Sequence, residues 1–137
     1  MDNNNSGKTL LVVEDHVDTQ MLMKQILKRD GYVVHTVGSG EEAGAHLKEN
    51  PAPDIILLDL TLPQMTGEEF MCELRNNSSW KDIQVLVISG WDDLSERAAA
   101  AGANGSLKKP FSISDFHRQL DHIFSKDHNP SQDLGLQ

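Results

Sequence analysis

Five short aliphatic runs, each followed by a segment of helical spacing, constrain the fold of this chain more than any other feature. The runs are rich in valine, isoleucine and leucine and lack the polar alternation of a half-exposed strand, so they predict strands buried on both faces, as in parallel sheets. They cover residues 9–13, 32–36, 54–58, 83–88 and 105–108. The intervening helical patterns cover residues 17–29, 41–49, 67–75, 92–101 and 113–124.

Several helix ends carry local signals. Ser39 precedes Glu42, and Thr66 precedes Glu69, at the spacing of a capping box. Gly31 follows the first helical segment, where a glycine commonly ends a helix. The boundaries of the elements are therefore encoded locally.

The alternation of strands and helices predicts an α/β fold. With right-handed crossovers, it gives a doubly wound (βα)5 architecture, an open parallel sheet of five strands with helices on both faces. We expect one domain over residues 9–125. Residues 1–8 and 126–137 are polar and without periodicity, which predicts an N-terminal tail and a C-terminal tail or linker.

Size and charge exclude several classes of protein. The 137 residues suffice for one core, and no apolar run reaches the roughly 20 residues of a membrane span, so we expect no membrane insertion. The N-terminus does not resemble a signal peptide either, which favours a cytoplasmic protein. The single cysteine, Cys72, excludes an internal disulfide framework and a zinc site built from cysteines. Twelve Lys and Arg against 21 Asp and Glu give a net charge of −9, which disfavours direct binding to nucleic acid.

Charged and polar residues follow the predicted strands at one edge of the sheet. Glu14 and Asp15 follow the first strand, Asp59 the third, Ser89 the fourth, and Lys109 the fifth. Because the carboxyl ends of parallel strands meet at one edge, these residues converge on one cleft. Clustered carboxylates repel each other unless a cation lies among them, and oxygen ligands suit Mg²⁺ or Mn²⁺. The sequence therefore predicts a divalent metal site.

The order of these residues resembles the receiver domain of two-component response regulators. The resemblance implies a flavodoxin-like (CheY-like) fold, with a five-stranded parallel sheet of order 2-1-3-4-5. Residues 59–67 are similar to the phosphoacceptor loop of that family, and residues 102–111 to its fifth-strand signature. The resemblance covers about residues 8–125. Its motifs are strong evidence for the family because they occur together, in order and after the matching strands. The residues that carry it are Glu14, Asp15, Asp59, Pro63, Gly67, Ser89, Lys109 and Pro110.

The resemblance implies that Asp59 accepts a phosphoryl group from a sensor histidine kinase or a histidine phosphotransfer protein. Asp15, Asp59 and the backbone carbonyl of Thr61 would then hold Mg²⁺ or Mn²⁺, with Glu14 acting through water. Such a domain is a signalling switch in a phosphorelay rather than an enzyme, since it catalyses only its own phosphorylation and dephosphorylation. Its downstream target is a protein that the sequence does not name.

The same resemblance implies a switch. Lys109 would pair with the phosphoryl oxygens, and the Ser89 hydroxyl would bond to one of them, which would move the loop of Gly90 and Trp91. We also predict that Trp91 shields the acyl phosphate from water. Ser106 departs from the family pattern, because an aromatic residue usually stands there.

Partners would bind the face formed by the fourth helix, fifth strand and fifth helix, and the resemblance allows a transient homodimer there. As a simpler alternative, Glu14 and Asp15 could serve only as helix-capping acids. We expect the six histidines to be structural or exposed, with His16 as the exception because it follows Asp15 and could affect access to the metal.

Three other functions fit the fold class. A flavodoxin-like electron carrier needs a loop rich in Ser, Thr and Gly after the first strand, where Glu14 and Asp15 would repel its phosphate. A haloacid-dehalogenase-type phosphohydrolase, as that family goes, needs an aspartate two residues after its nucleophile, where this chain has Thr61. A receiver that binds partners without phosphorylation is kept open by Ser106.

Overall fold

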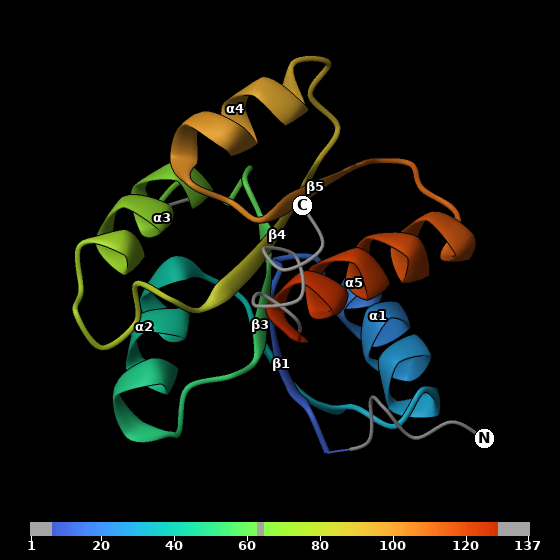
Figure 1. The fold of residues 1–137 in the computed structure, drawn as a ribbon, viewed down its shortest axis with the longest axis horizontal. Helices are drawn as coiled ribbons and strands as arrows, with labels where there is room; N and C mark the ends of the chain where they lie inside the picture. Colours follow the sequence, from blue (N-terminus) through green and yellow to red (C-terminus); the bar gives the residue numbers. More distant parts are fainter. Residues whose placement is uncertain (1–6, 63–64, 129–137) are drawn as a thin grey trace, which may run out of the picture.

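The computed structural model describes residues 7–62 and 65–128, with side-chain burial described to residue 125. A parallel five-stranded sheet forms its centre (Figure 1). The strands are β1 (Thr9–Val13), β2 (Val33–Val37), β3 (Ile55–Asp59), β4 (Gln84–Ser89) and β5 (Gly105–Lys108). Their order is β2-β1-β3-β4-β5, and every neighbouring pair is parallel, which confirms the predicted topology.

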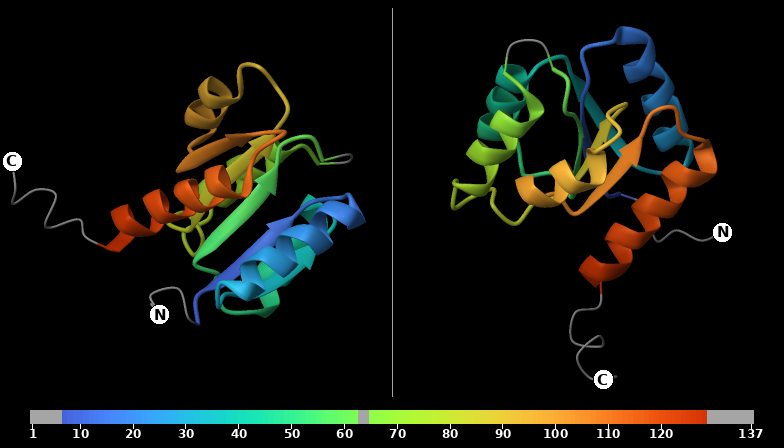
Figure 2. Two further views of the ribbon diagram at one scale, coloured as in Figure 1. Left: turned by 90° about the vertical axis from the view of Figure 1, so that its right-hand side faces the viewer. Right: turned by 90° about the horizontal axis from the view of Figure 1, so that it is seen from above.

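Helices cover both faces of the sheet (Figures 1 and 2). One face is covered by α1 (Val17–Arg29) and α5 (Ile113–His128). The other is covered by α2 (Gly40–Glu49), α3 (Gly67–Arg75) and α4 (Leu94–Ala101). This is the layering that the alternating pattern predicts.

Alternate residues of the strands supply two core layers. Leu11 of β1 packs with the layer beneath α2, α3 and α4, while its neighbour Leu10 packs with the layer beneath α1 and α5. Ile56 and Ile55 of β3 divide in the same way, and all four side chains are fully buried. Burial on both faces explains why these strands read as continuous aliphatic runs.

The start of α3 is fixed next to β3. Thr66 and Glu69 form the predicted capping box, with the Thr66 hydroxyl accepting from the Glu69 amide and the Glu69 carboxylate accepting from the Thr66 amide. Gly67 packs directly on the chain after β3, since a Cβ atom there would lie 2.5 Å from Leu60 Cα and 2.9 Å from the Asp59 carbonyl oxygen. A glycine is therefore required at this contact.

The other predicted helix signals are confirmed with one change. The Ser39 hydroxyl accepts from the Glu42 amide, but the Glu42 carboxylate accepts from the amide of Gly38 rather than that of Ser39. Gly31 follows α1 with a φ of 96°, in the left-handed region that glycine adopts easily.

Several bounds differ from the sequence expectation by a few residues. The last helix runs to His128 rather than ending at residue 124, and α4 begins at Leu94 rather than at residue 92. Pro63 of the predicted phosphoacceptor loop lies outside the described residues, as do 1–6 and 129–137 of the predicted tails. Across the described ranges, every helix is too short or too polar to traverse a lipid bilayer.

Candidate functional site

The sheet register brings the predicted residues to one edge. Asp59, the last residue of β3, lies beside Ile88 of β4, and Ser89 lies beside Lys108 of β5. The Lys109 amide donates to the Ser89 carbonyl oxygen at 2.8 Å, and a cis peptide bond joins Lys109 to Pro110. Parallel pairing thus gathers residues from separate parts of the chain, as the sequence predicts.

Asp59 is a buried carboxylate held in one orientation. Its side chain is 1% exposed. Its Oδ1 accepts from the Thr61 amide at 2.8 Å and from the Thr61 hydroxyl at 2.7 Å. Its Oδ2 accepts from Lys109 Nζ at 3.4 Å. Thr61 therefore fixes one carboxylate oxygen and leaves the other facing the lysine.

Lys109 bridges two buried carboxylates. Its Nζ lies 3.3 Å from Glu14 Oε1 and 3.4 Å from Asp59 Oδ2. Burial of the ammonium lowers the pKa of Lys109, but the charges of Asp59 and Glu14 outweigh this effect, and the pKa stands above its ordinary value. Lys109 is therefore the resident cation of the cluster.

The acidic cluster fits a divalent cation. Glu14, Asp15, His16 and Asp59 each offer a ligand atom, and these atoms lie within 4.8 Å of one another. The Asp15 Oδ1 atom is buried and accepts no hydrogen bond from the described residues. Three carboxylates against the ammonium of Lys109 leave a formal charge of −2 when His16 is neutral. An unsatisfied oxygen and this charge suit a hard cation.

His16 contacts the cluster more closely than the sequence indicates. Its Nδ1 lies 2.8 Å from Glu14 Oε2 and 3.4 Å from Asp15 Oδ1, while its side chain is 67% exposed. The hydrogen bond to Glu14 and the nearby acids raise the pKa of His16. The one signal in the sequence was its position directly after Asp15.

The loop after β4 holds the predicted switch residues. Ser89 is buried, and its hydroxyl accepts from the Trp91 amide at 3.2 Å. Gly90 between them is exposed. Ser106 lies in β5 beside Val87 and is half-buried. The Ser89 hydroxyl is therefore engaged with its own loop in this structure.

Trp91 is held by Arg97 and Glu68, two residues that no motif in the sequence marks. The guanidinium carbon of Arg97 lies 3.7 Å from the Trp91 ring centre, and Arg97 donates two hydrogen bonds to the Glu68 carboxylate, at 2.9 and 3.1 Å. We call Glu68, Arg97 and Trp91 the clasp. It joins the starts of α3 and α4 to the loop after β4, and the ring packs on the core beneath these helices.

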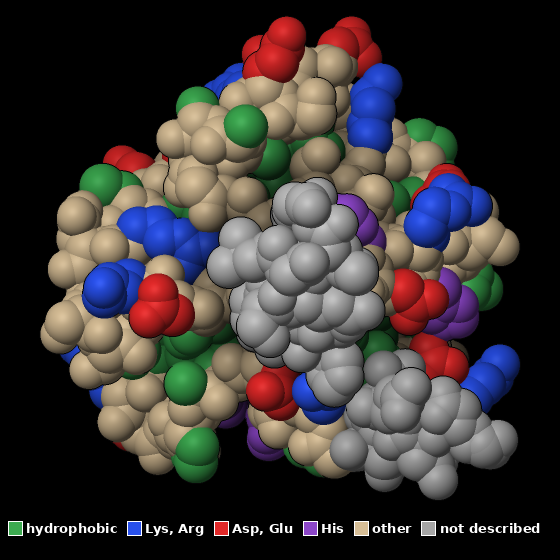
Figure 3. All heavy atoms as spheres, viewed as in Figure 1, with side chains coloured by type: hydrophobic (Ala, Val, Ile, Leu, Met, Phe, Trp, Pro, Cys, Tyr) green, Lys and Arg blue, Asp and Glu red, His purple; other side chains and the backbone are tan. Residues whose placement is uncertain are grey.

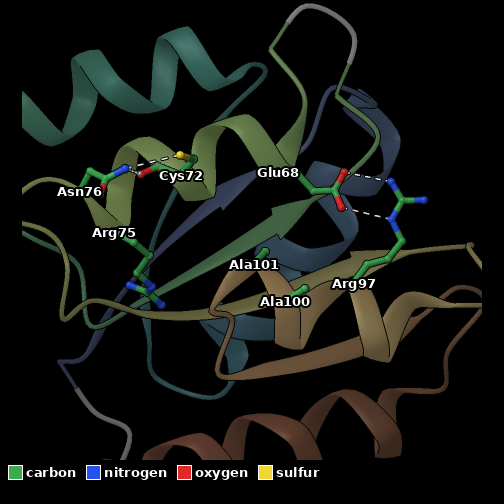
Figure 4. Close-up of a pocket in the computed structure, with 7 residues that line it drawn as sticks. All are labelled: Glu68, Cys72, Arg75, Asn76, Arg97, Ala100 and Ala101. Atoms are coloured by element: carbon green, nitrogen blue, oxygen red, sulfur yellow. Dashed lines mark hydrogen bonds and ion pairs between the residues drawn. The ribbon is translucent and has the colours of Figure 1, made fainter.

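A groove of about 400 Å³ lies beside the clasp, between α3 and α4 (Figure 4). Arg75 closes its far end by donating to the carbonyl oxygens of Gly102, Lys81 and Ile83. The groove is separate from the acidic cluster. It is lined by Glu68, Cys72, Arg75, Asn76, Arg97, Ala100 and Ala101.

Comparison with known proteins shows which family the chain belongs to. The sequence profile of the response regulator receiver domain matches residues 10–121, which is most of the chain. The chain belongs to the response regulator receiver domain family. The expected sheet order and the expected family are therefore both confirmed.

Individual receiver proteins show how far the similarity extends. The chain is 36% identical to the transcriptional regulatory protein PdtaR of Mycobacterium tuberculosis over 79% of its own length, but it spans only 52% of that relative. It is 28% identical to CheY4 of Vibrio cholerae, with a TM-score of 0.79, covering 86% of this chain and 99% of the other.

A third similar protein is the receiver domain of the sensor histidine kinase PA1611 from Pseudomonas aeruginosa. That structure has a magnesium ion coordinated in its active-site cleft. It is 28% identical with a TM-score of 0.77, and the match covers 88% of this chain and 99% of the other.

Proposed function

We propose that Asp59 of this receiver domain accepts a phosphoryl group from a phosphohistidine. The observation that carries the proposal is the buried Asp59 carboxylate, with one oxygen fixed by Thr61 and the other facing Lys109. Asp59 Oδ2 forms the new bond to phosphorus while the bond from phosphorus to the imidazole nitrogen breaks. The electron pair leaves with the imidazole, which takes a proton from solvent, and an acyl phosphate remains on Asp59.

The main barrier to this step is charge repulsion, and the residues around Asp59 would lower it. An incoming phosphoryl group brings negative oxygens to a cluster that already holds three carboxylates. Asp15, Asp59 and the Thr61 carbonyl would hold Mg²⁺ or Mn²⁺, with Glu14 acting through water, and the cation would neutralise charge on the phosphoryl oxygens. Lys109 is placed to pair with the same oxygens once they replace its contact with Asp59.

The phosphorylated state would differ from the free state at Ser89. Its hydroxyl proton can bond to a phosphoryl oxygen only when the phosphoryl group is present. In the free state its oxygen accepts from the Trp91 amide. A contact made in one state alone shifts the equilibrium between them, so Ser89, Gly90 and Trp91 form the expected trigger. The half-buried Ser106 replaces the usual aromatic reporter, and the loop after β4 would carry more of the signal.

The partners follow from this proposal. A sensor histidine kinase or a histidine phosphotransfer protein would supply the phosphoryl group in the cytoplasm, and a downstream protein would bind the face of α4, β5 and α5. A transient homodimer through that face belongs to the same proposal. Acidic and basic side chains are both visible on the side of the molecule drawn in Figure 3.

Intact-mass measurement after incubation with acetyl phosphate tests the proposal. We expect one added phosphoryl group with Mg²⁺, and none with EDTA or in the Asp59→Asn variant. Asp54→Asn is the matched control, because Asp54 is an exposed carboxylate just before the opposite end of β3. Addition to Asp59→Asn would disprove the assignment of the acceptor. No adduct in the wild type, together with no stable beryllofluoride complex, would favour a receiver that acts without phosphorylation.

A further inference from the structure

We propose that His35 and His46 form a binding site for a transition-metal ion such as Cu²⁺ or Zn²⁺, with the two imidazoles as its protein ligands and water completing the coordination. The ring centres of the two histidines lie 5.0 Å apart. The pair shares no residue with the acidic cluster at the strand ends. The proposal therefore holds or fails independently of phosphoryl transfer.

The fold brings the two histidines together from a strand and a helix. His35 lies beside Leu11 in the parallel pair of β1 and β2, so its side chain points to the sheet face that α2 covers. His46 flanks the buried stripe of Ala43 and Leu47 on α2. Because β2 is the outer strand of the sheet, His35 is exposed and His46 is half-buried. A metal ion can therefore reach the pair from solvent.

The separation of the rings matches two imidazoles bound to one metal. A metal about 2.0 Å from an imidazole nitrogen lies about 3.2 Å from the ring centre, so two such rings at a right or tetrahedral angle have centres about 4.5–5.2 Å apart. The observed separation of 5.0 Å falls within this range. The ring planes are inclined at 47°, so the rings are not stacked face to face and an edge of each can face a common ion.

Asn50 orients the ring of His46. The Asn50 side-chain amide donates to the His46 carbonyl oxygen at 2.9 Å and contacts His46 Nδ1 at 3.4 Å. Contacts of this kind commonly orient the histidines of metal sites. Since Asn50 lies on the Nδ1 side of the ring, Nε2 is the nitrogen that we assign to the metal. The exposed His35 can adjust its ring to the same ion.

The surroundings of His46 favour the form of the ring that binds a metal. A histidine must be neutral to act as a ligand. Partial burial and the neighbouring His35 lower the pKa of His46, and they outweigh the charge of Glu49, which acts in the opposite direction. His46 is therefore neutral at neutral pH. The Glu49 carboxylate also adds negative charge near the pair, which favours a bound cation.

Ligand chemistry predicts which metals the pair takes. Imidazole nitrogen suits Zn²⁺, Cu²⁺ and Ni²⁺, whereas Mg²⁺ prefers oxygen ligands. Among these metals Cu²⁺ should bind most tightly, following the general order of affinities. Excess Mg²⁺ should fill the acidic cluster and leave the two imidazoles free, so the two sites can be measured separately.

Isothermal titration of the full chain with ZnCl₂ in excess MgCl₂ tests the proposal. We expect His35→Ala and His46→Ala each to weaken Zn²⁺ binding at least about tenfold, since loss of even a group that supports a metal site has an effect of this size. The double variant should bind little more weakly than either single variant, because one imidazole alone does not chelate. His122→Ala, at an exposed position on α5, should leave the affinity unchanged. Additive losses in the double variant, or no loss in either single variant, would overturn the proposal.

A spectroscopic measurement identifies the ligands directly. In excess Mg²⁺, paramagnetic Cu²⁺ should broaden the imidazole NMR signals of His35 and His46 together, and sharp signals from either ring in the copper-bound chain would contradict the assignment. Acetyl phosphate with Mg²⁺ should still phosphorylate both single variants, which shows that they are folded. A wild type that binds Zn²⁺ through the pair but is not phosphorylated would refute the role of Asp59 and support the metal site alone.

Discussion

Lys109 Nζ lies 3.4 Å from Asp59 Oδ2, although 50 positions separate the two residues in the chain. The same nitrogen lies 3.3 Å from Glu14 Oε1. One ammonium thus balances two buried carboxylates that come from different strand ends. This relationship makes the cluster sensitive to the loss of a single positive charge.

Replacing Lys109 with methionine should destabilise the protein by about 1–3 kcal/mol at neutral pH, because two buried carboxylates lose their partner. The pKa of Lys109 is raised in the folded state. Its stabilising contribution is therefore complete below its unfolded pKa of 10.5 and is lost as the pH rises through the folded value. Urea unfolding of both proteins from pH 7 to pH 11 measures this. A difference that grows at alkaline pH would contradict the assignment.

Replacing Gly67 with alanine should destabilise the protein by about 1–3 kcal/mol, because the added methyl group overlaps backbone and side-chain atoms of Leu60. The displaced backbone carries Asp59, so phosphorylation by acetyl phosphate should slow as well. Gly44→Ala is the control, since a Cβ there meets no atom within 4 Å and alanine favours the helix. Equal stability of the two variants would show that the contact at Gly67 is not required.

Replacing Arg97 with alanine should release Trp91 from the clasp. The ring loses the guanidinium at 3.7 Å, and we expect a red-shifted and altered Trp91 emission. The measurement uses a Trp80→Phe background, so that Trp91 is the remaining tryptophan. An emission spectrum identical to that of the background protein would mean that Arg97 does not hold the ring.

Replacing Glu68 with glutamine should change how the free energy of unfolding depends on pH in the acid range. The hydrogen bond from Arg97 lowers the pKa of Glu68, so its contribution is present above the unfolded value of 4.5 and is lost as the pH falls through the folded value. Because both side chains are more than one-third exposed, the effect should be small. Denaturation midpoints from pH 3 to pH 6 should converge for wild type and variant at the acid end. Glu73→Gln, at an exposed position on the same helix, is the control variant.

Replacing Trp91 with alanine tests whether this side chain shields the acyl phosphate. The ring packs beside Arg97 on the core, two residues after Ser89. If it also limits access of water to Asp59, the phosphorylated variant should lose its phosphoryl group severalfold faster than the wild type. The decay of the phosphorylated mass after removal of acetyl phosphate gives the rate. An unchanged half-life would assign Trp91 to the clasp alone.

Local patterns predicted most of the fold, because each element is encoded over short stretches. The Thr66 capping box and Gly31 fix helix ends through interactions within a few residues. The aliphatic runs predicted strands within one or two residues of their observed bounds, and their position before charged residues indicated the edge that carries the site. Motifs of this kind depend on interactions between residues close together in the chain, so they can be recognised from the sequence.

The clasp and the contact between His16 and Glu14 were not predictable in the same way. Arg97 and Glu68 are 29 positions apart, and nothing in the sequence distinguishes this ion pair from other surface charges. His16 is adjacent to Asp15 in the chain, but its approach to Glu14 depends on the turn between β1 and α1. These contacts require side-chain directions that periodicity does not specify.

The sequence by itself determined the alternation of strands and helices, the acids at the strand ends and the family of the chain, because buried strands and helix caps depend on residue type and spacing. The tertiary structure alone decided which atoms meet. It fixed one oxygen of Asp59 on Thr61 and turned the other to Lys109, and it left Asp15 Oδ1 without a hydrogen-bond donor among the described residues. The physical reason is that these contacts join different strand ends, and their distances are set by the packing of the whole sheet.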